Sequence, residues 1–167
     1  MPFTFSVLPV ITRVRAAVKA SFTAQGEAPL ELPLTTTARQ VAEAGGDFPL
    51  TLIQWDEVDA SEDDCPVNSV RLAAAITIHH LRMPEPGTGS GAETAILRMS
   101  GLAAFMRQDY RLESVAAAGD PFSIERVIVG KLLGGEKNPV QQMLDMNNQE
   151  QLVVSLALTV IWQEDLS

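Results

Sequence analysis

The sequence has little of several things that would reveal a function. One cysteine, Cys65, in 167 residues excludes a disulfide bond within the chain. Only 12 residues are basic against 21 acidic ones, and they are scattered, whereas a nucleic-acid-binding surface needs clustered Lys and Arg. The longest apolar run without a charge, 152–162, is too short to span a bilayer. These absences favour a globular protein that folds in a reducing cytoplasm and does not read DNA sequence.

Signals for export and catalysis are also missing. Apolar residues near the start come before Arg13 and Arg15, which reverses the order in a signal peptide. No G-x-S-x-G, Walker A, C-x-x-C or H-x-x-x-H motif occurs. The glycine-rich stretch 83–91 has no lysine and is interpreted as a linker. Cys65 has no basic neighbour that would activate it as a nucleophile. The sequence therefore predicts no cofactor, no metal and no enzyme.

The histidine pair His79–His80 is the one candidate for chemistry. Adjacent residues of a strand point to opposite faces, so both cannot bind one metal ion while the strand stays regular. We interpret the pair as structural. A small-ligand enzyme that uses one of them with an acidic residue remains an alternative.

Strict alternation in the segment 151–165 predicts a strand with one buried face. The apolar face consists of Leu152, Val154, Leu156, Leu158, Val160 and Trp162. The other face, Val153, Ser155, Ala157, Thr159 and Ile161, is small and uncharged. We expect a helix of the same chain or a neighbouring subunit to cover it.

A second long strand is predicted over 68–82. Its even positions are apolar, and its odd positions Arg71, Ala73, Ala75 and Thr77 are small or polar. Further strands are expected over 48–57 and 122–133. Helices are expected over 5–22, 36–44, 93–110 and 138–146, with Asn138 as the cap of the last one. The predicted fold is α+β: a mainly antiparallel sheet of about four strands with helices packed on one face, in one domain over 1–167. Residues 26–47 form an irregular, insertion-like segment.

The two longest strands suggest an oligomer. At roughly 3.3 Å per residue each would measure about 45 Å, whereas a domain of this size is about 40 Å across. The strands are therefore predicted to project as arms whose unpaired backbone needs a partner. The expected subunit interface consists of Arg71, Ala73, Ala75, Thr77, Val153, Ser155, Ala157 and Thr159.

An acidic stretch, 56–64, is predicted to be a loop between two strands. Its acidic residues are Asp56, Glu57, Asp59, Glu62, Asp63 and Asp64. They lack the spacing and the glycine of an EF-hand, so a calcium site is not favoured. The loop is interpreted as a solvated one, with a channel lining or a contact to a partner's basic patch as its candidate role.

The order of these segments resembles that of a known family. A helix over 8–22 is followed by a strand that ends in Ile53-Gln-Trp55, the long strand 70–81, the helix 93–110, the strand 124–133 and a final strand that ends in Val160-Ile-Trp162. This order is similar to that of the tail-terminator and tail-completion proteins of long-tailed bacteriophages, with the Mu-like prophage branch the closest resemblance.

The resemblance implies a structural protein of the virion, assembled in the host cytoplasm. Such a protein forms a homo-oligomeric ring, typically a hexamer, that stops polymerisation of the tail-tube protein and meets the head–tail connector protein. DNA passes through its bore without specific binding. The alternatives are another ring component, such as a tail-tube or neck protein, and a plain adaptor domain that binds one partner through the sheet face.

Overall fold

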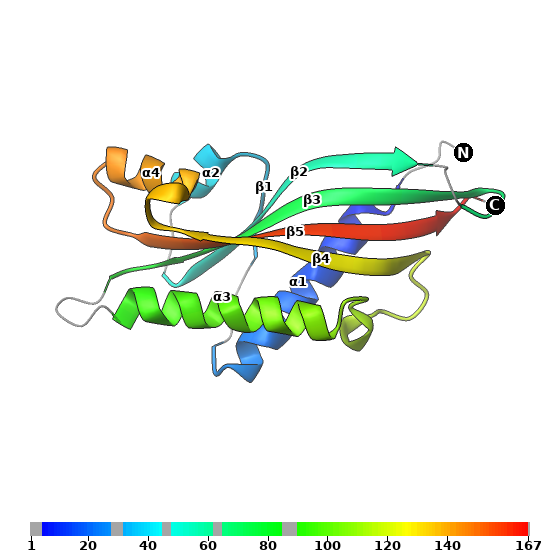
Figure 1. Cartoon of the computed structure of the whole chain (residues 1–167), viewed down its shortest axis with the longest axis horizontal. Coiled ribbons are helices and arrows are strands. Elements are labelled where there is room, and N and C mark those ends of the chain that lie inside the picture. Colours follow the sequence, from blue (N-terminus) through cyan, green and yellow to red (C-terminus); the bar gives the residue numbers. More distant parts are fainter. Residues whose placement is uncertain (1–4, 28–31, 45–47, 62–64, 85–89, 167) are drawn as a thin grey trace.

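The computed structural model describes residues 5–27, 32–44, 48–61, 65–84 and 90–166, which form an α+β fold around one five-stranded sheet. The elements are α1 (Val7–Ala24), β1 (Leu34–Thr35), α2 (Ala38–Ala42), β2 (Leu50–Ser61), β3 (Ser69–Arg82), α3 (Ser90–Gln108), β4 (Phe122–Gly134), α4 (Pro139–Met146) and β5 (Leu152–Asp165), with short 3₁₀ turns at Glu113–Val115 and Gly135–Lys137. The strand order is β1-β2-β3-β5-β4 (Figure 1). Only β1 and β2 are parallel, so the predicted fold class is confirmed for the described residues, with one strand more than expected.

The two longest strands, β3 and β5, lie in the middle of the sheet. They pair with each other along their whole length, from Ser69 opposite Asp165 to Arg82 opposite Leu152. On its other side β3 pairs with β2, and β5 pairs with β4. The prediction of projecting arms is therefore wrong, because neighbouring strands of the same chain use the backbone donors and acceptors that it assumed to be free.

One face of the sheet is covered by α1 and α3, which cross beneath the strands in Figure 1. The alternating residues of β5 on this face are buried from Val154 to Trp162, as the sequence predicts, whereas Leu152 at the start of the strand is only half-buried. Leu156, Val160 and Trp162 have no exposed area. The helices supply matching apolar residues, among them Phe22 of α1 and Met99 of α3. Burial of this apolar layer is the main source of stability.

The opposite face is covered at one end by α2 and α4. Val41 of α2 and Val140 and Leu144 of α4 pack with Leu81 and Val153 in a second, smaller core. The expectation that the helices share one face is therefore wrong for α2 and α4. The two short helices lie on the second face because Leu81 and Val153 are apolar residues that point to this face, and α2 and α4 shield them from water.

Strand β2 is longer than expected. It runs to Ser61, so Asp56, Glu57 and Asp59 lie on a strand, and the predicted loop is wrong for them. A bulge between Trp55 and Glu57 shifts their pairing with β3. The remaining acidic residues Glu62, Asp63 and Asp64 lie outside the described residues, as do 28–31 and 45–47 of the insertion-like segment and 85–89 of the predicted linker. The described part of the segment 26–47 contains β1 and α2.

A pair of substitutions in β5 tests which face is covered. Leu156→Ala should lower the free energy of unfolding by about 2–5 kcal/mol, because it leaves a cavity under α1 and α3. Thr159→Ala, three residues away on the other face, should cost less than about 1 kcal/mol, since its side chain is half-buried. Urea unfolding of both variants measures this, and equal losses would contradict the arrangement.

Candidate functional site

Half of the second sheet face is not covered by any described helix, and we call it the open half-face. It consists of Arg71, Ala73, Ala75 and Thr77 of β3, Ala157, Thr159 and Ile161 of β5, and Ile128 of β4. Figure 1 shows α2 and α4 at one end of this face and the bare strands beyond them. The alanines and threonines are half-buried, and Ile128 is 40 % exposed. Most of these side chains are small, and all of them except Arg71 are uncharged.

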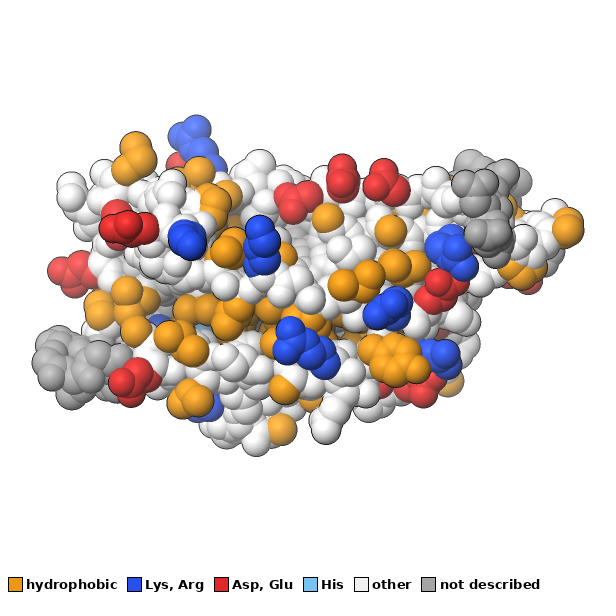
Figure 2. Space-filling model, in the orientation of Figure 1, with side chains coloured by type: hydrophobic (Ala, Val, Ile, Leu, Met, Phe, Trp, Pro, Cys, Tyr) orange, Lys and Arg blue, Asp and Glu red, His pale blue; other side chains and the backbone are white. Residues whose placement is uncertain are grey.

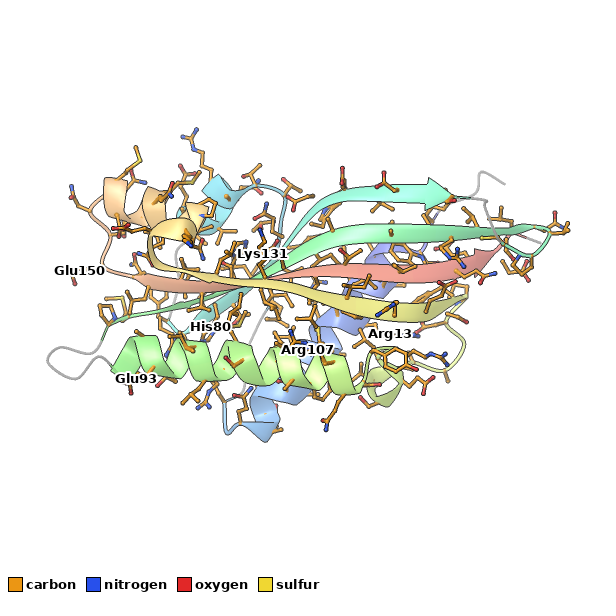
Figure 3. The ribbon with its side chains drawn as sticks, viewed as in Figure 1. Arg13, His80, Glu93, Arg107, Lys131 and Glu150 are labelled. Carbon is orange, nitrogen blue, oxygen red and sulfur yellow. The ribbon has the colours of Figure 1, made fainter. Side chains whose placement is uncertain are left out.

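The two sides of the open half-face carry opposite charges. Asp56, Glu57 and Asp59, all exposed, form an acidic border on β2. Arg126 and Lys131, also exposed, form a basic border on β4. Figure 2 shows the acidic side chains in a row over β2 and basic ones below them, and Figure 3 labels Lys131 on β4. No ion pair joins either basic residue to an acid within the part of the chain that the structure describes.

The strand pairing places the two borders at the same height along the strands. Asp59 pairs with Ala73, which pairs with Ile161, which pairs with Arg126. Glu57 is connected in the same way through Ala75 and Thr159 to Ile128. Three strand spacings of about 4.8 Å separate the borders, which is more than a Debye length of about 8 Å. The opposite charges therefore do not neutralise each other within one molecule.

Not all predicted interface residues lie on this surface. Val153 and Ser155 are 2 % exposed beneath α4, so the covering helix of the same chain takes their part of the face. Arg71 closes the far end of the half-face through an ion pair with Glu125, at 3.0 Å. The basic border and Ile128 were missed, because bulges after Ile124 and Val129 change which residues of β4 face outward.

His79 and His80 point to opposite faces, as expected from their adjacency. The Nε2 of His79 lies 2.9 Å from Oε1 of Gln54, and its Nδ1 lies 2.6 Å from the hydroxyl of Ser155. Since the Gln54 amide donates to Asp56, its oxygen accepts from Nε2–H, and Nδ1 accepts from Ser155. Asn138 Nδ2 donates to the same hydroxyl at 2.8 Å and its Oδ1 caps α4. The network joins β2, β3, β5 and α4.

His80 lies between the sheet and the helices, where Figure 3 labels it. Its Nδ1 is 2.9 Å from the hydroxyl of Thr51, and its ring meets Phe22 edge-on at 5.1 Å. Next to it Glu27 accepts hydrogen bonds from Arg82 and Arg98 at 2.8 and 2.7 Å. Burial raises the pKa of Glu27, but the hydrogen bond from Arg98 and the charge of Arg82 outweigh it and hold that pKa below its usual value.

The contact between His79 and Ser155 has the composition of a base–nucleophile pair, but its surroundings are those of a structural network. The two residues are 4 % and 2 % exposed, which keeps a substrate away from both. Burial lowers the pKa of each histidine to about 4, so both rings are neutral at pH 7. Within the described residues no group of three His, Cys, Asp or Glu side chains is arranged to hold a metal ion. None of the described helices is long and apolar enough to cross a membrane.

Comparison with models of known protein families finds no match to this sequence, and comparison with curated proteins finds none either. The open half-face and its borders are therefore the features from which a function can be inferred.

The two buried histidines predict that stability falls in acid. Each has a pKa of about 4 in the folded protein against 6.5 when unfolded, so the unfolded chain binds protons first as the pH falls from 6.5 to 4. Each ring should cost about 3 kcal/mol across this window. The lowered pKa of Glu27 adds a loss below its usual value of 4.5. Urea unfolding at a series of pH values measures the sum.

His79→Asn should remove about half of the histidine-dependent decline between pH 6.5 and 4.5, since one of the two titrating rings is gone. His80→Asn should do the same. A decline as steep as that of the unmodified protein in both variants would show that these rings do not control it.

Proposed function

We propose that this chain is a structural protein that assembles with copies of itself into a ring, and that this ring ends the head-proximal side of a bacteriophage tail. The observation that carries the proposal is the open half-face with its two oppositely charged borders. A sheet face is normally solvated through polar and charged side chains, whereas the centre of this one presents Ala, Thr and Ile.

The area of the open half-face indicates that the contact between copies extends to the charged borders. The open half-face is seven residues long, from 71 to 77 on β3, and about three strands wide, which gives on the order of 300 Å². A stable interface buries about 800 Å² on each partner. The half-face alone is too small, so the proposed contact includes the charged borders on β2 and β4. The interface residues that remain from the sequence are Arg71, Ala73, Ala75, Thr77, Ala157 and Thr159.

The identity of the assembly is supported by the resemblance to tail-terminator proteins. The resemblance concerns an order of helix, strand, long strand, helix, strand and final strand, which corresponds to α1, β2, β3, α3, β4 and β5. In this proposal the ring is a hexamer in the virion that binds the tail-tube protein on one side and the head–tail connector on the other. DNA passes through the bore, and the chain needs no catalytic residue.

Sedimentation and electron microscopy of the purified protein test the proposal. Isolated rings at micromolar concentration are the expected result, whereas long tubes would identify a tail-tube protein. A monomer at these concentrations would contradict the proposal.

Two substitutions locate the contact. Ala75→Glu and Thr159→Lys should each weaken assembly roughly tenfold or more, because each places a charge without an opposite partner in the contact, and position 75 lies directly opposite Glu57. Ser100→Lys, on the exposed side of α3, is the matched control and should leave the rings intact. Circular dichroism confirms that each variant is folded. If the first two variants formed rings as stable as those of the unmodified protein, the open half-face would not be part of the interface.

A further inference from the structure

In an aligned packing, the open half-face does not fit the same half-face of a second copy. Two copies can stack face to face with their strands aligned in two ways. In both, a two-fold axis lies between the two sheets; it runs along the strands in one arrangement and across them in the other. Each meets a different obstacle, and both obstacles follow from the positions of α2, α4 and the charged borders.

With the axis along the strands, sterics exclude the pair. This rotation exchanges the β2 and β4 sides but keeps each end of the strands at the same end. The small core around Leu81 and Val153 places α2 and α4 together on the second face, above one end of the sheet (Figure 1). The α2–α4 pairs of the two copies would then occupy the same space between the sheets.

With the axis across the strands, electrostatics oppose the pair. The helices of the two copies now lie at opposite ends, but β2 lies over β2 and β4 over β4. Asp56, Glu57 and Asp59 would face the same three acids, and Arg126 and Lys131 would face the same two bases. Like charges brought together in an interface cost several kcal/mol.

We infer that the copies associate head to tail, with the acidic border of one copy against the basic border of the next. This inference rests on the proposed ring and names the residues that join it. The borders lie on opposite sides of the sheet, and Asp59 and Arg126 are at the same height. Contact between the β2 side of one copy and the β4 side of the next thus brings Asp59 to Arg126, and Glu57 to the level of Ile128 between Arg126 and Lys131, without a shift along the strands. The same contact covers the adjoining strands of the open half-face, with Ala75 of one copy and Thr159 of the next. An interface between two different surfaces makes closed rings when its rotation closes.

The contact uses side chains, not an added strand. Among the described residues, β1 pairs with the edge of β2 at Ile53 and Gln54 only, so the acidic border lies on an outer edge. The edge of β4 is already occupied at Val127, whose N–H donates to the carbonyl of Tyr110 at 2.6 Å. Bulges in both strands further disfavour backbone pairing between copies.

Charge reversal tests the inference. An acid-reversed variant, Glu57→Lys with Asp59→Lys, and a base-reversed variant, Arg126→Glu with Lys131→Glu, each have like charges on both borders. Each alone should assemble at least roughly tenfold more weakly than the unmodified protein. An equal mixture of the two variants should restore rings. When they alternate around the ring, a basic border of one variant meets an acidic border of the other at every contact.

The matched control is Arg39→Glu with Glu43→Lys, which exchanges the partners of an exposed ion pair on α2 and should leave assembly unchanged. If a reversed variant does not fold, crosslinking replaces it. In a Cys65→Ser background, Asp59→Cys and Arg126→Cys chains should form disulfide-linked dimers when mixed and oxidised, but neither should do so alone.

The outcomes separate the inference from the proposed function. Rings of unmodified protein together with full assembly of both reversed variants would overturn the inference and leave the ring. The inference would also be overturned if the acid-reversed and base-reversed variants were folded but did not assemble when mixed. It would be overturned as well if mixed Asp59→Cys and Arg126→Cys chains formed rings without a disulfide crosslink. A monomeric unmodified protein would overturn both.

Discussion

The pairing of β3 with β5 is the constraint on which the rest of the structure depends. The two strands are 14 residues each and face each other at every position. A ladder of this length has two long faces that need cover. The helices α1 and α3 are long enough to cover one face, whereas α2 and α4 are short and cover only one end of the other. The open half-face is what remains, and its existence follows from helix lengths and not from any special motif.

Polar residues mark the place where the cover changes. His79 and Ser155 lie opposite each other in the central ladder, and Asn138 connects them to the start of α4. A buried histidine is tolerated there because both ring nitrogens have partners and the ring stays neutral at pH 7. The same network positions α4, so it fixes where the covered part of the face ends and the open half-face begins.

Much of the local structure was predictable from the sequence, because it depends on neighbouring residues. The alternation of apolar residues in β5 and the Asn-Pro start of α4 both indicate the observed elements. Pairing between distant strands was not predictable, and it explains the wrong expectation of arms. The acidic residues of β2 were assigned to a loop because acids are uncommon in strands, yet an exposed border tolerates them. The candidate site was found in part: the small residues of β3 and β5 were expected, but the bulges of β4 concealed Arg126, Ile128 and Lys131.

If a second copy contacts the open half-face and its borders, assembly must protect these residues from solvent, and hydroxyl-radical footprinting of dilute and concentrated protein measures that protection. Ile128 lies between the two bases of the basic border and is 40 % exposed, while Leu97 on α3 is 63 % exposed and serves as the internal reference. Labelling of Ile128 should fall relative to that of Leu97 as the concentration rises and the protein assembles. Equal labelling of Ile128 in the monomer and in the assembly would contradict this contact.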